Sequence, residues 1–195
     1  MPRLAIAWPG NYYIPVNDVQ EYLAMDDAAL LGRCDVHVYK ASGPGGQHRN
    51  KVSSAVRVRH QVTQITAHGD ETRSQHENKR LAIRRLRMNI ALQLRQPISR
   101  ETSELPPVVA ECIFRPRKAG PDARQRLQVG RKDRRFWATA AFLLDVLEAF
   151  EGGLADAAAY VGITTSNFIS TLKSDRHLYA AAQTLRKRHG RRPIT

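Results

Sequence analysis

The sequence has few cysteines, no long apolar run and few acidic residues, and each shortage excludes a class of protein. Its two cysteines, Cys34 and Cys112, stand far apart and belong to no Cys-x-x-Cys pair or Cys/His cluster. A zinc finger and a disulfide framework are therefore excluded, no metal or other cofactor is expected, and a reducing, cytoplasmic location is predicted. No window approaches the ~20 apolar residues of a membrane span, and the apolar patch within residues 1–10 is too short for a signal peptide.

The shortage of acidic residues leaves a strong positive charge. The 195 residues include 31 Lys+Arg against 18 Asp+Glu, which gives a formal net charge of +13. Such an excess predicts a polyanionic partner. The charge is uneven: residues 1–40 and 136–175 carry −2 and −4, whereas residues 41–95, 96–135 and 176–195 carry +8, +5 and +6. The distribution indicates an acidic-to-neutral module between two basic surfaces.

The first half of the chain predicts an α+β domain, a small mixed sheet with a long amphipathic helix. Val36 and Val38, and again Val56 and Val58, alternate with polar residues as in half-buried strands, and residues 65–68 form a weaker third strand. Ser74 and Glu77 have the spacing of a capping box and precede apolar residues at helical spacing, so a helix is expected over about 75–94. Its other side carries a basic stripe of Arg80, Arg84 and Arg87.

The second half predicts a linker and a helical module. Five prolines punctuate residues 96–132, which favours a linker or extended arm, and its basic stretch 114–135 is either a solvated connection or a segment that orders on nucleic acid. Beyond it, helices are expected over 138–150, 154–161, from a cap at Thr165 or Ser166 to residue 172, and over 175–189, in a helix-turn-helix-like arrangement. The predicted domains are 1–95, 96–135 and 136–195.

The loop between the first two predicted strands carries the most distinctive motif, Ser42-Gly43-Pro44-Gly45-Gly46-Gln47-His48-Arg49-Asn50-Lys51. Its glycines allow positive φ and a close approach to another molecule. A flexible loop is one interpretation. A phosphate-binding loop is disfavoured, because the Walker spacing is absent and no helix follows directly.

This motif resembles the catalytic loop of class I peptide chain release factors and of their shorter ribosome-rescue relatives. The resemblance covers roughly residues 33–95, since Ser54-Ala55-Val56-Arg57 with His60, and Arg73-Ser74-Gln75 with Asn78-Lys79, follow the family's order and spacing. The chain departs from the family at Val62-Thr63-Gln64, where Pro-Thr-Gly is frequent, and at Arg49, where an apolar residue is usual. These differences concern the hairpin and RNA contacts rather than Gly45, Gly46 and Gln47.

The resemblance implies codon-independent hydrolysis of the ester of peptidyl-tRNA on the ribosome, with Gly45, Gly46 and Gln47 as the catalytic residues. The loop holds no strong nucleophile or base, which suits an activated ester that needs a positioned water and a stabilised oxyanion. By analogy with the family, the backbone N–H of Gln47 would bind the oxyanion or the leaving ribose oxygen. The two glycines would aim that N–H, and the Gln47 side chain would shape the pocket. Stop-codon reading is not expected, because the 40 residues before the motif leave no room for a codon-reading domain.

The implied partners are the peptidyl-transferase centre of the ribosome, ribosomal RNA and peptidyl-tRNA, and the protein is expected to act as a monomer. The expected RNA-binding residues are the polar and basic ones around the loop and in the C-terminal tail: His48, Arg49, Asn50, Lys51, Arg57, Arg59, Arg73, Gln75, Lys79, Arg186, Lys187, Arg188, Arg191 and Arg192. The basic tail or the arm 114–135 could sense an empty mRNA channel.

Two other functions stay open at this point. One is a helix-turn-helix regulator that binds DNA. It is disfavoured because the expected recognition helix has a single basic residue, Lys173. The other is a non-catalytic ribosome-binding or RNA-binding protein. It is disfavoured because the Gly-Gly-Gln loop is intact.

Overall fold

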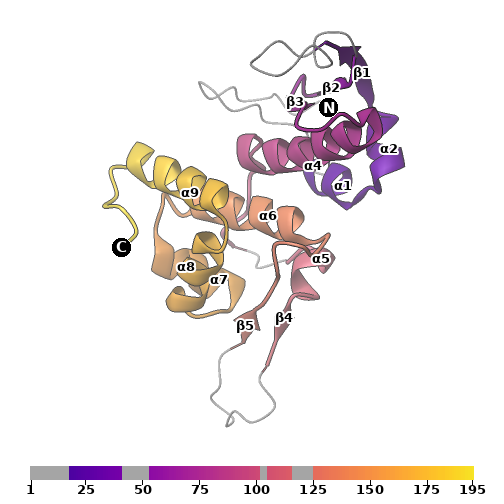
Figure 1. The fold of residues 1–195 in the computed structure, drawn as a ribbon. Coiled ribbons are helices and arrows are strands. Elements are labelled where there is room, and N and C mark those ends of the chain that lie inside the picture. The colour runs from indigo at the N-terminus through magenta and orange to yellow at the C-terminus, as the bar shows by residue number, and fades with distance from the viewer. Residues whose placement is uncertain (1–17, 41–52, 102–104, 116–124) are drawn as a thin grey trace, which may run out of the picture. The chain divides into compact units, whose positions relative to one another are not determined.

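A computed structural model describes residues 18–40, 53–101, 105–115 and 125–195, which fall into two compact units. Among the described residues, one unit lies within 21–90, and the other consists of 18–20, 91–101, 105–115 and 125–195. Figure 1 labels the elements: α1 (Asp18–Ala24), α2 (Asp27–Leu31), β1 (Cys34–Tyr39), β2 (Ala55–His60), β3 (Thr66–Gly69), α4 (Gln75–Gln93), α5 (Pro107–Ala110), β4 (Ile113–Phe114), β5 (Arg126–Leu127), α6 (Phe136–Ala149), α7 (Leu154–Val161), α8 (Thr165–Lys173) and α9 (Arg176–Arg188).

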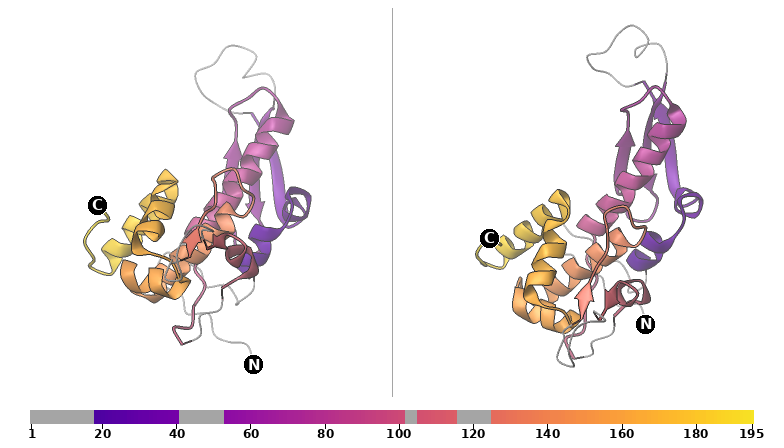
Figure 2. Two further views of the ribbon diagram at one scale, coloured as in Figure 1. Left: turned by 90° about the horizontal axis from the view of Figure 1, so that it is seen from below. Right: turned by 60° about the horizontal axis from the view of Figure 1, so that its bottom comes forward.

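The unit 21–90 is a three-stranded sheet packed on α4, which confirms the expected α+β class. The strand order is β1-β2-β3 and both pairings are antiparallel, so the sheet is not mixed. α4 lies along one face of the sheet (Figure 2), where Val56, Val58 and Ala67 are buried together with Ala82 and Leu86 of the helix. The apolar spacing of the helix thus forms the core that was expected.

β1 is more exposed than its alternating sequence predicted. Val36 pairs with Val58 and Val38 with Val56, so the four valines share the face that α4 covers. Val36 and Val38 nevertheless stay 39% and 43% exposed. On this face α4 lies nearer the opposite edge, β3, where Arg85 and Asn89 donate hydrogen bonds to the carbonyls of His68 and Thr66. β1 is therefore an edge strand outside the reach of the helix.

Two short helices precede the sheet and were not predicted. Asp26 caps α2 by accepting a hydrogen bond from the Ala29 N–H at 2.7 Å. Arg87 of α4 donates to the Leu23 carbonyl at 3.1 Å and to the Asp27 carboxylate at 2.9 Å. Arg80 and Arg84 are exposed as the basic stripe predicted, but Arg87 is largely buried and holds these helices in place.

The C-terminal unit packs α5 and α7–α9 around α6. α6 is buried along almost its whole length, and its core residues include Phe136, Leu143 and Leu147 with Phe168 of α8. In the segment predicted as a linker, the described residues contribute to this core: Val109, Cys112 and Leu127 are buried, and β4 pairs with β5. These apolar side chains are too widely spaced to form a periodic pattern, which is why the sequence indicated an extended arm.

The turn between α7 and α8 has the helix-turn-helix form that was expected. Gly162 ends α7 with a left-handed φ of 79°, and α8 follows after two residues. The cap of α8 is Thr164, whose hydroxyl accepts from the Asn167 N–H at 3.2 Å, rather than Thr165 or Ser166. Asp175 caps α9 in the same way.

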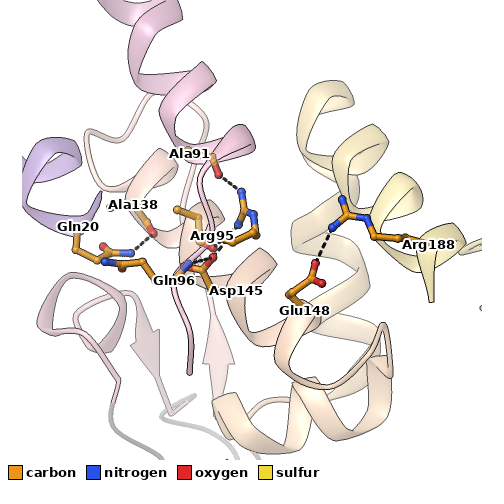
Figure 3. A network of polar contacts seen from close by, with 9 residues as sticks. Gln20, Ala91, Arg95, Gln96, Ala138, Asp145, Glu148 and Arg188 are labelled. Atoms are coloured by element: carbon orange, nitrogen blue, oxygen red, sulfur yellow. Dashed lines mark hydrogen bonds and ion pairs between the residues drawn. The ribbon is translucent and has the colours of Figure 1, made fainter. Parts of the chain in front are cut away.

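A buried ion pair joins α6 to the chain that follows α4. Arg95 and Asp145 are 3% and 2% exposed, and their nearest nitrogen and oxygen atoms lie 2.9 Å apart. Figure 3 shows that Asp145 also accepts from the backbone N–H of Gln96, while Arg95 donates to the carbonyl of Ala91. The same guanidinium donates to the Ala141 carbonyl at 3.2 Å. Main-chain groups thus complete the hydrogen bonding of both charged side chains.

Candidate functional site

The Gly-Gly-Gln loop connects β1 to β2, and the structure describes the two strands from which it emerges. Tyr39, the last residue of β1, pairs with Ala55, the first residue of β2. The predicted catalytic residues Gly45, Gly46 and Gln47 lie outside the described residues, as do His48, Arg49, Asn50 and Lys51. The described residues therefore form the base of the loop.

Asn78 fixes the base of the loop on the β2 side. Its side chain is fully buried, and its amide nitrogen donates to the Ser54 and Thr72 carbonyls, both at 2.8 Å. Its amide oxygen accepts from the Thr72 N–H at 3.0 Å and from the Thr72 hydroxyl at 3.2 Å. One side chain of α4 thus joins the residue before β2 to the turn after β3. The sequence showed Asn78 as part of a motif, but only the structure gives it this positioning role.

The start of α4 lies beside this base and is capped by Ser74. The Ser74 hydroxyl accepts from the Glu77 N–H at 3.3 Å, as the capping box predicted. The Ser74 N–H donates to the Thr72 hydroxyl at 3.1 Å, so Thr72 takes the place that Glu77 has in a complete box. Thr72 therefore links the helix cap to the Asn78 amide.

A close backbone contact completes this arrangement. An ideal Cβ built on Gly69, the last residue of β3, would lie 2.0 Å from the Asn78 carbonyl oxygen and 2.8 Å from its carbon. Only glycine fits at this crossing of β3 and α4. The strand can therefore approach the helix closely enough for Asn78 to reach Ser54.

Several predicted RNA-binding residues are exposed near the loop. Arg57 lies on the open face of β2 and pairs in register with His37 and His68, while Arg73 and Gln75 are exposed where α4 begins. Lys79, one turn into α4, is half-buried. These side chains thus lie on the sheet and at the start of α4, whose Asn78 binds the residue before β2.

Arg59 has a partner within the protein. Its guanidinium binds the Asp35 carboxylate at 3.0 Å across the β1–β2 pairing. Hydrogen bonds from Gln61 and Arg59 hold the pKa of Asp35 below its ordinary value. Arg59 is exposed but neutralised, which makes Arg57 the better candidate for a phosphate contact on this face.

The open face of the sheet also carries an aromatic pair that the sequence did not reveal. The Tyr39 and His68 rings meet edge to face with centroids 6.1 Å apart, and the Tyr39 hydroxyl lies 3.2 Å from Nδ1 of His68. The two residues come from β1 and β3, so no local pattern could have paired them. They stand next to Arg57 on a face suited to bases and phosphates.

Comparison with known proteins places this unit in a family. Residues 32–106 match the model of the RF-1 domain, which spans β1, β2, β3 and α4. We refer to residues 32–106 as the RF-1 domain, after the family model that they match. The chain is 49% identical over 82 residues to peptide chain release factor 2 of Buchnera aphidicola subsp. Baizongia pistaciae, which is 40% of this chain and 22% of that protein.

Other relatives match over similar lengths. Peptide chain release factor 1 of Paracidovorax citrulli is 42% identical over 77 residues, which is 40% of this chain and 20% of that protein. Peptide chain release factor 2 of Borreliella burgdorferi is 49% identical over 55 residues, which is 28% and 15% of the two chains. The chain thus spans about a fifth or less of the length of these relatives.

The structure revises the prediction for one basic residue of the C-terminal tail, Arg186. Arg186 is 9% exposed, and its guanidinium donates to the carbonyls of Gly152 and Arg192. It is therefore a structural residue and not available to phosphate. Ile194 is buried, and its carbonyl accepts from the Tyr179 hydroxyl at 2.7 Å, so the end of the tail is folded back onto α9.

The other basic residues of the tail are exposed: Lys187, Arg188, Arg191 and Arg192. Arg188 lies 3.5 Å from Glu148, and Arg191 donates to the Glu151 carbonyl at 3.1 Å. Among the described residues, no helix is long and apolar enough to cross a membrane, and no group of three His, Cys, Asp or Glu side chains could hold a metal ion.

His60, at the end of β2 in the RF-1 domain, is fully buried. Its ring meets Tyr22 edge on at 4.4 Å between centroids, and its Nδ1 accepts from the Thr63 N–H at 3.3 Å. That contact leaves the proton of the neutral ring on Nε2, which has no partner among the described residues. Burial lowers the pKa of His60, and the charge of Arg33 lowers it further.

We therefore expect the RF-1 domain to lose stability as pH falls through about 6.5, the usual pKa of an unfolded histidine. Because the folded pKa is the lower one, the unfolded state binds more protons below that pH, and the free energy of unfolding falls. Urea unfolding followed by circular dichroism between pH 7.5 and 5.5 measures this loss. The loss should be smaller in His60→Gln, which cannot become charged. An equal pH dependence in the two proteins would show that His60 is not its source.

Proposed function

We propose that this chain hydrolyses the ester of peptidyl-tRNA on the ribosome and does so without reading a stop codon. The observation that carries the proposal is Gly45-Gly46-Gln47 on the β1–β2 loop of an RF-1 domain. RF-1 domain proteins act on the ribosome with peptidyl-tRNA, and the relatives named above are peptide chain release factors. Independence of a stop codon is the more specific part of the proposal, and it rests on the resemblance to short rescue factors.

The chemistry assigned to the loop needs geometry more than reactive side chains. Water attacks the ester carbonyl, the oxyanion is stabilised by the Gln47 backbone N–H, and the ribose hydroxyl leaves with a proton. Gly45 and Gly46 give the backbone the freedom to aim that N–H. The described base of the loop supports this role, because Asn78 and Thr72 hold Ser54 and the start of α4 in fixed positions.

Peptide release from purified ribosomes tests the proposal. We expect the chain to release labelled peptide from ribosomes stalled on truncated mRNA, and not from free peptidyl-tRNA. Gly46→Ala should lower the rate on the order of a hundred- to thousandfold, the cost of one misaligned oxyanion donor. Gln47→Ala should also abolish most release while leaving ribosome affinity nearly unchanged. Arg100→Gln, an exposed change outside the loop, should release normally.

The alternatives give different results. Ribosome binding without release by the unaltered chain would indicate a non-catalytic binding protein. Release that responds only to a stop codon in the decoding site would contradict codon independence. A normal rate in Gly46→Ala would contradict the proposed mechanism.

A further inference from the structure

The C-terminal unit contains a polar groove beside α8 that the proposed hydrolysis does not use. β5 contacts α8, and the groove between residues 126–129 and α8 has a volume of about 420 Å³. Its lining is mainly polar: Arg126 and Gln128 on one side, and Asn167, Ser170, Thr171 and Ser174 on the other. The groove lies beyond the 32–106 segment that matches the RF-1 domain.

Asn167 holds the two walls of this groove together. Its amide oxygen accepts from the Leu127 N–H at 2.8 Å, and its amide nitrogen donates to the Leu127 carbonyl at 3.0 Å. A parallel bridge between Gln125 and Ile163 fixes the approach to the same strand. One side chain of α8 therefore satisfies both backbone groups of a β5 residue, and the groove is preformed.

The lining of the groove presents hydrogen-bond donors and includes no acidic residue. Arg126, Gln128 and Ser170 are exposed, and their side chains have no hydrogen-bond or ionic partner among the described residues. Arg131 binds the Asp175 carboxylate through Nε at 3.2 Å, next to Ser174, and stays 66% exposed. The Arg126 guanidinium, the Gln128 amide and the Ser170 hydroxyl, with Arg131 beside Ser174, are groups of the kind that contact nucleic-acid phosphates.

We propose that this groove binds a single-stranded segment of RNA through its phosphates. The choice of RNA rests on the proposed ribosomal function. A DNA duplex fits the surface poorly, because β5 is hydrogen-bonded along α8 and covers one flank of the helix that would enter a major groove. The single basic residue of α8, Lys173, is already engaged, with its amine 2.8 Å from the Thr195 carbonyl.

A matched pair of substitutions on α8 tests the groove. Ser170 and Ser166 are both exposed on this helix, but only Ser170 lines the groove. Ser170→Glu and Ser166→Glu therefore add the same charge to the same helix. The full chain is titrated against a fluorescein-labelled single-stranded RNA of about 12 nucleotides, and anisotropy is recorded between about 50 and 200 mM KCl. We expect Ser170→Glu to bind at least about tenfold more weakly than Ser166→Glu.

Charge removal gives a second measurement. Arg126→Gln should flatten the slope of log affinity against log salt by about 0.7, the value for one phosphate contact on a single strand. Arg100→Gln removes an equal charge outside the groove and should leave the slope unchanged. A 4-thiouridine in the same RNA should crosslink to residues 126–129 or 166–174.

Three results would overturn the proposal. These are equal RNA affinities for the two glutamate variants, a crosslink confined to other segments, or a loss in Ser170→Glu that appears with a DNA duplex and not with RNA. None of these measurements uses peptide release. A failure of the groove therefore leaves the hydrolysis proposal standing, and an inactive loop leaves the RNA measurements readable.

Discussion

Replacing Asp145 by Leu should lower the free energy of unfolding of the C-terminal unit by about 3–5 kcal/mol. The change leaves the Arg95 guanidinium buried at 3% exposure without its counter-charge, and the Gln96 N–H loses its acceptor. Burial raises the pKa of Asp145 to about 7 despite the attraction of Arg95. Removing the two charges from water therefore offsets much of what their attraction contributes, and the cost of the variant is mainly the cost of the unpaired partner.

Replacing the partner, Arg95, should lower the free energy of unfolding less. Arg95→Met leaves a carboxyl whose pKa is already high and which becomes neutral by taking up a proton near pH 7. A guanidinium cannot escape in this way, because it keeps its proton in proteins. The double variant Arg95→Met/Asp145→Leu should lose less stability than Asp145→Leu alone, since no buried charge remains.

Urea unfolding at pH 7 gives the free energy of unfolding of the unaltered protein, the two single variants and the double variant. Trp137 on α6 is a fluorescent probe within the unit. The exposed pair of Arg100 and Glu151, at 54% and 61% exposure, supplies the control, and Arg100→Gln should change stability little. Additive losses in the double variant would show that the two buried groups do not interact, and the explanation by an unpaired charge would have to be abandoned.

The elements that could be predicted from the sequence are those that local patterns determine. Ser74 and the apolar spacing after it predict α4 because the cap and the buried stripe lie within the helix itself. The exposure of Val36 and Val38 was not predictable, since it depends on where α4 crosses the sheet. Three neighbouring residues, Thr164, Thr165 and Ser166, each carry a hydroxyl that could cap α8, so the sequence alone does not choose among them. The backbone geometry of the turn makes Thr164 the cap.

The residues of the candidate site likewise fall into those that the sequence revealed and those that only the structure shows. Gly45, Gly46 and Gln47 were found by resemblance, because no composition or periodicity assigns chemistry to a loop without reactive side chains. Arg186 was expected to bind RNA, yet its partner Gly152 is 34 residues away in the chain. Tyr39 and His68 are separated by 29 residues. Contacts at such distances follow from the packing of whole elements, which a single sequence does not reveal.

Gly69→Ala should cost about 3 kcal/mol or more, the upper end for an inserted methyl group, because it adds an atom where two backbones touch. The new Cβ would lie 2.0 Å from the Asn78 oxygen and 3.1 Å from the Ala82 nitrogen, and neither backbone atom can move away by a change of rotamer. β3 and α4 must separate. The separation would pull the Asn78 amide from Ser54 and Thr72, the residues that hold the base of the loop.

The effect on activity should exceed the effect on folding. At a temperature where Gly69→Ala is still folded by circular dichroism, we expect peptide release to fall while ribosome binding persists, because the loop that carries Gln47 is no longer held at the β2 side. Gly130→Ala is the matched control, since nothing lies within 4 Å of a Cβ at that position, and it should leave both properties unchanged. Unchanged stability in Gly69→Ala would mean that β3 and α4 are not in contact as described. Unchanged release in a destabilised variant would mean that the Asn78 contacts stabilise the domain without positioning its loop.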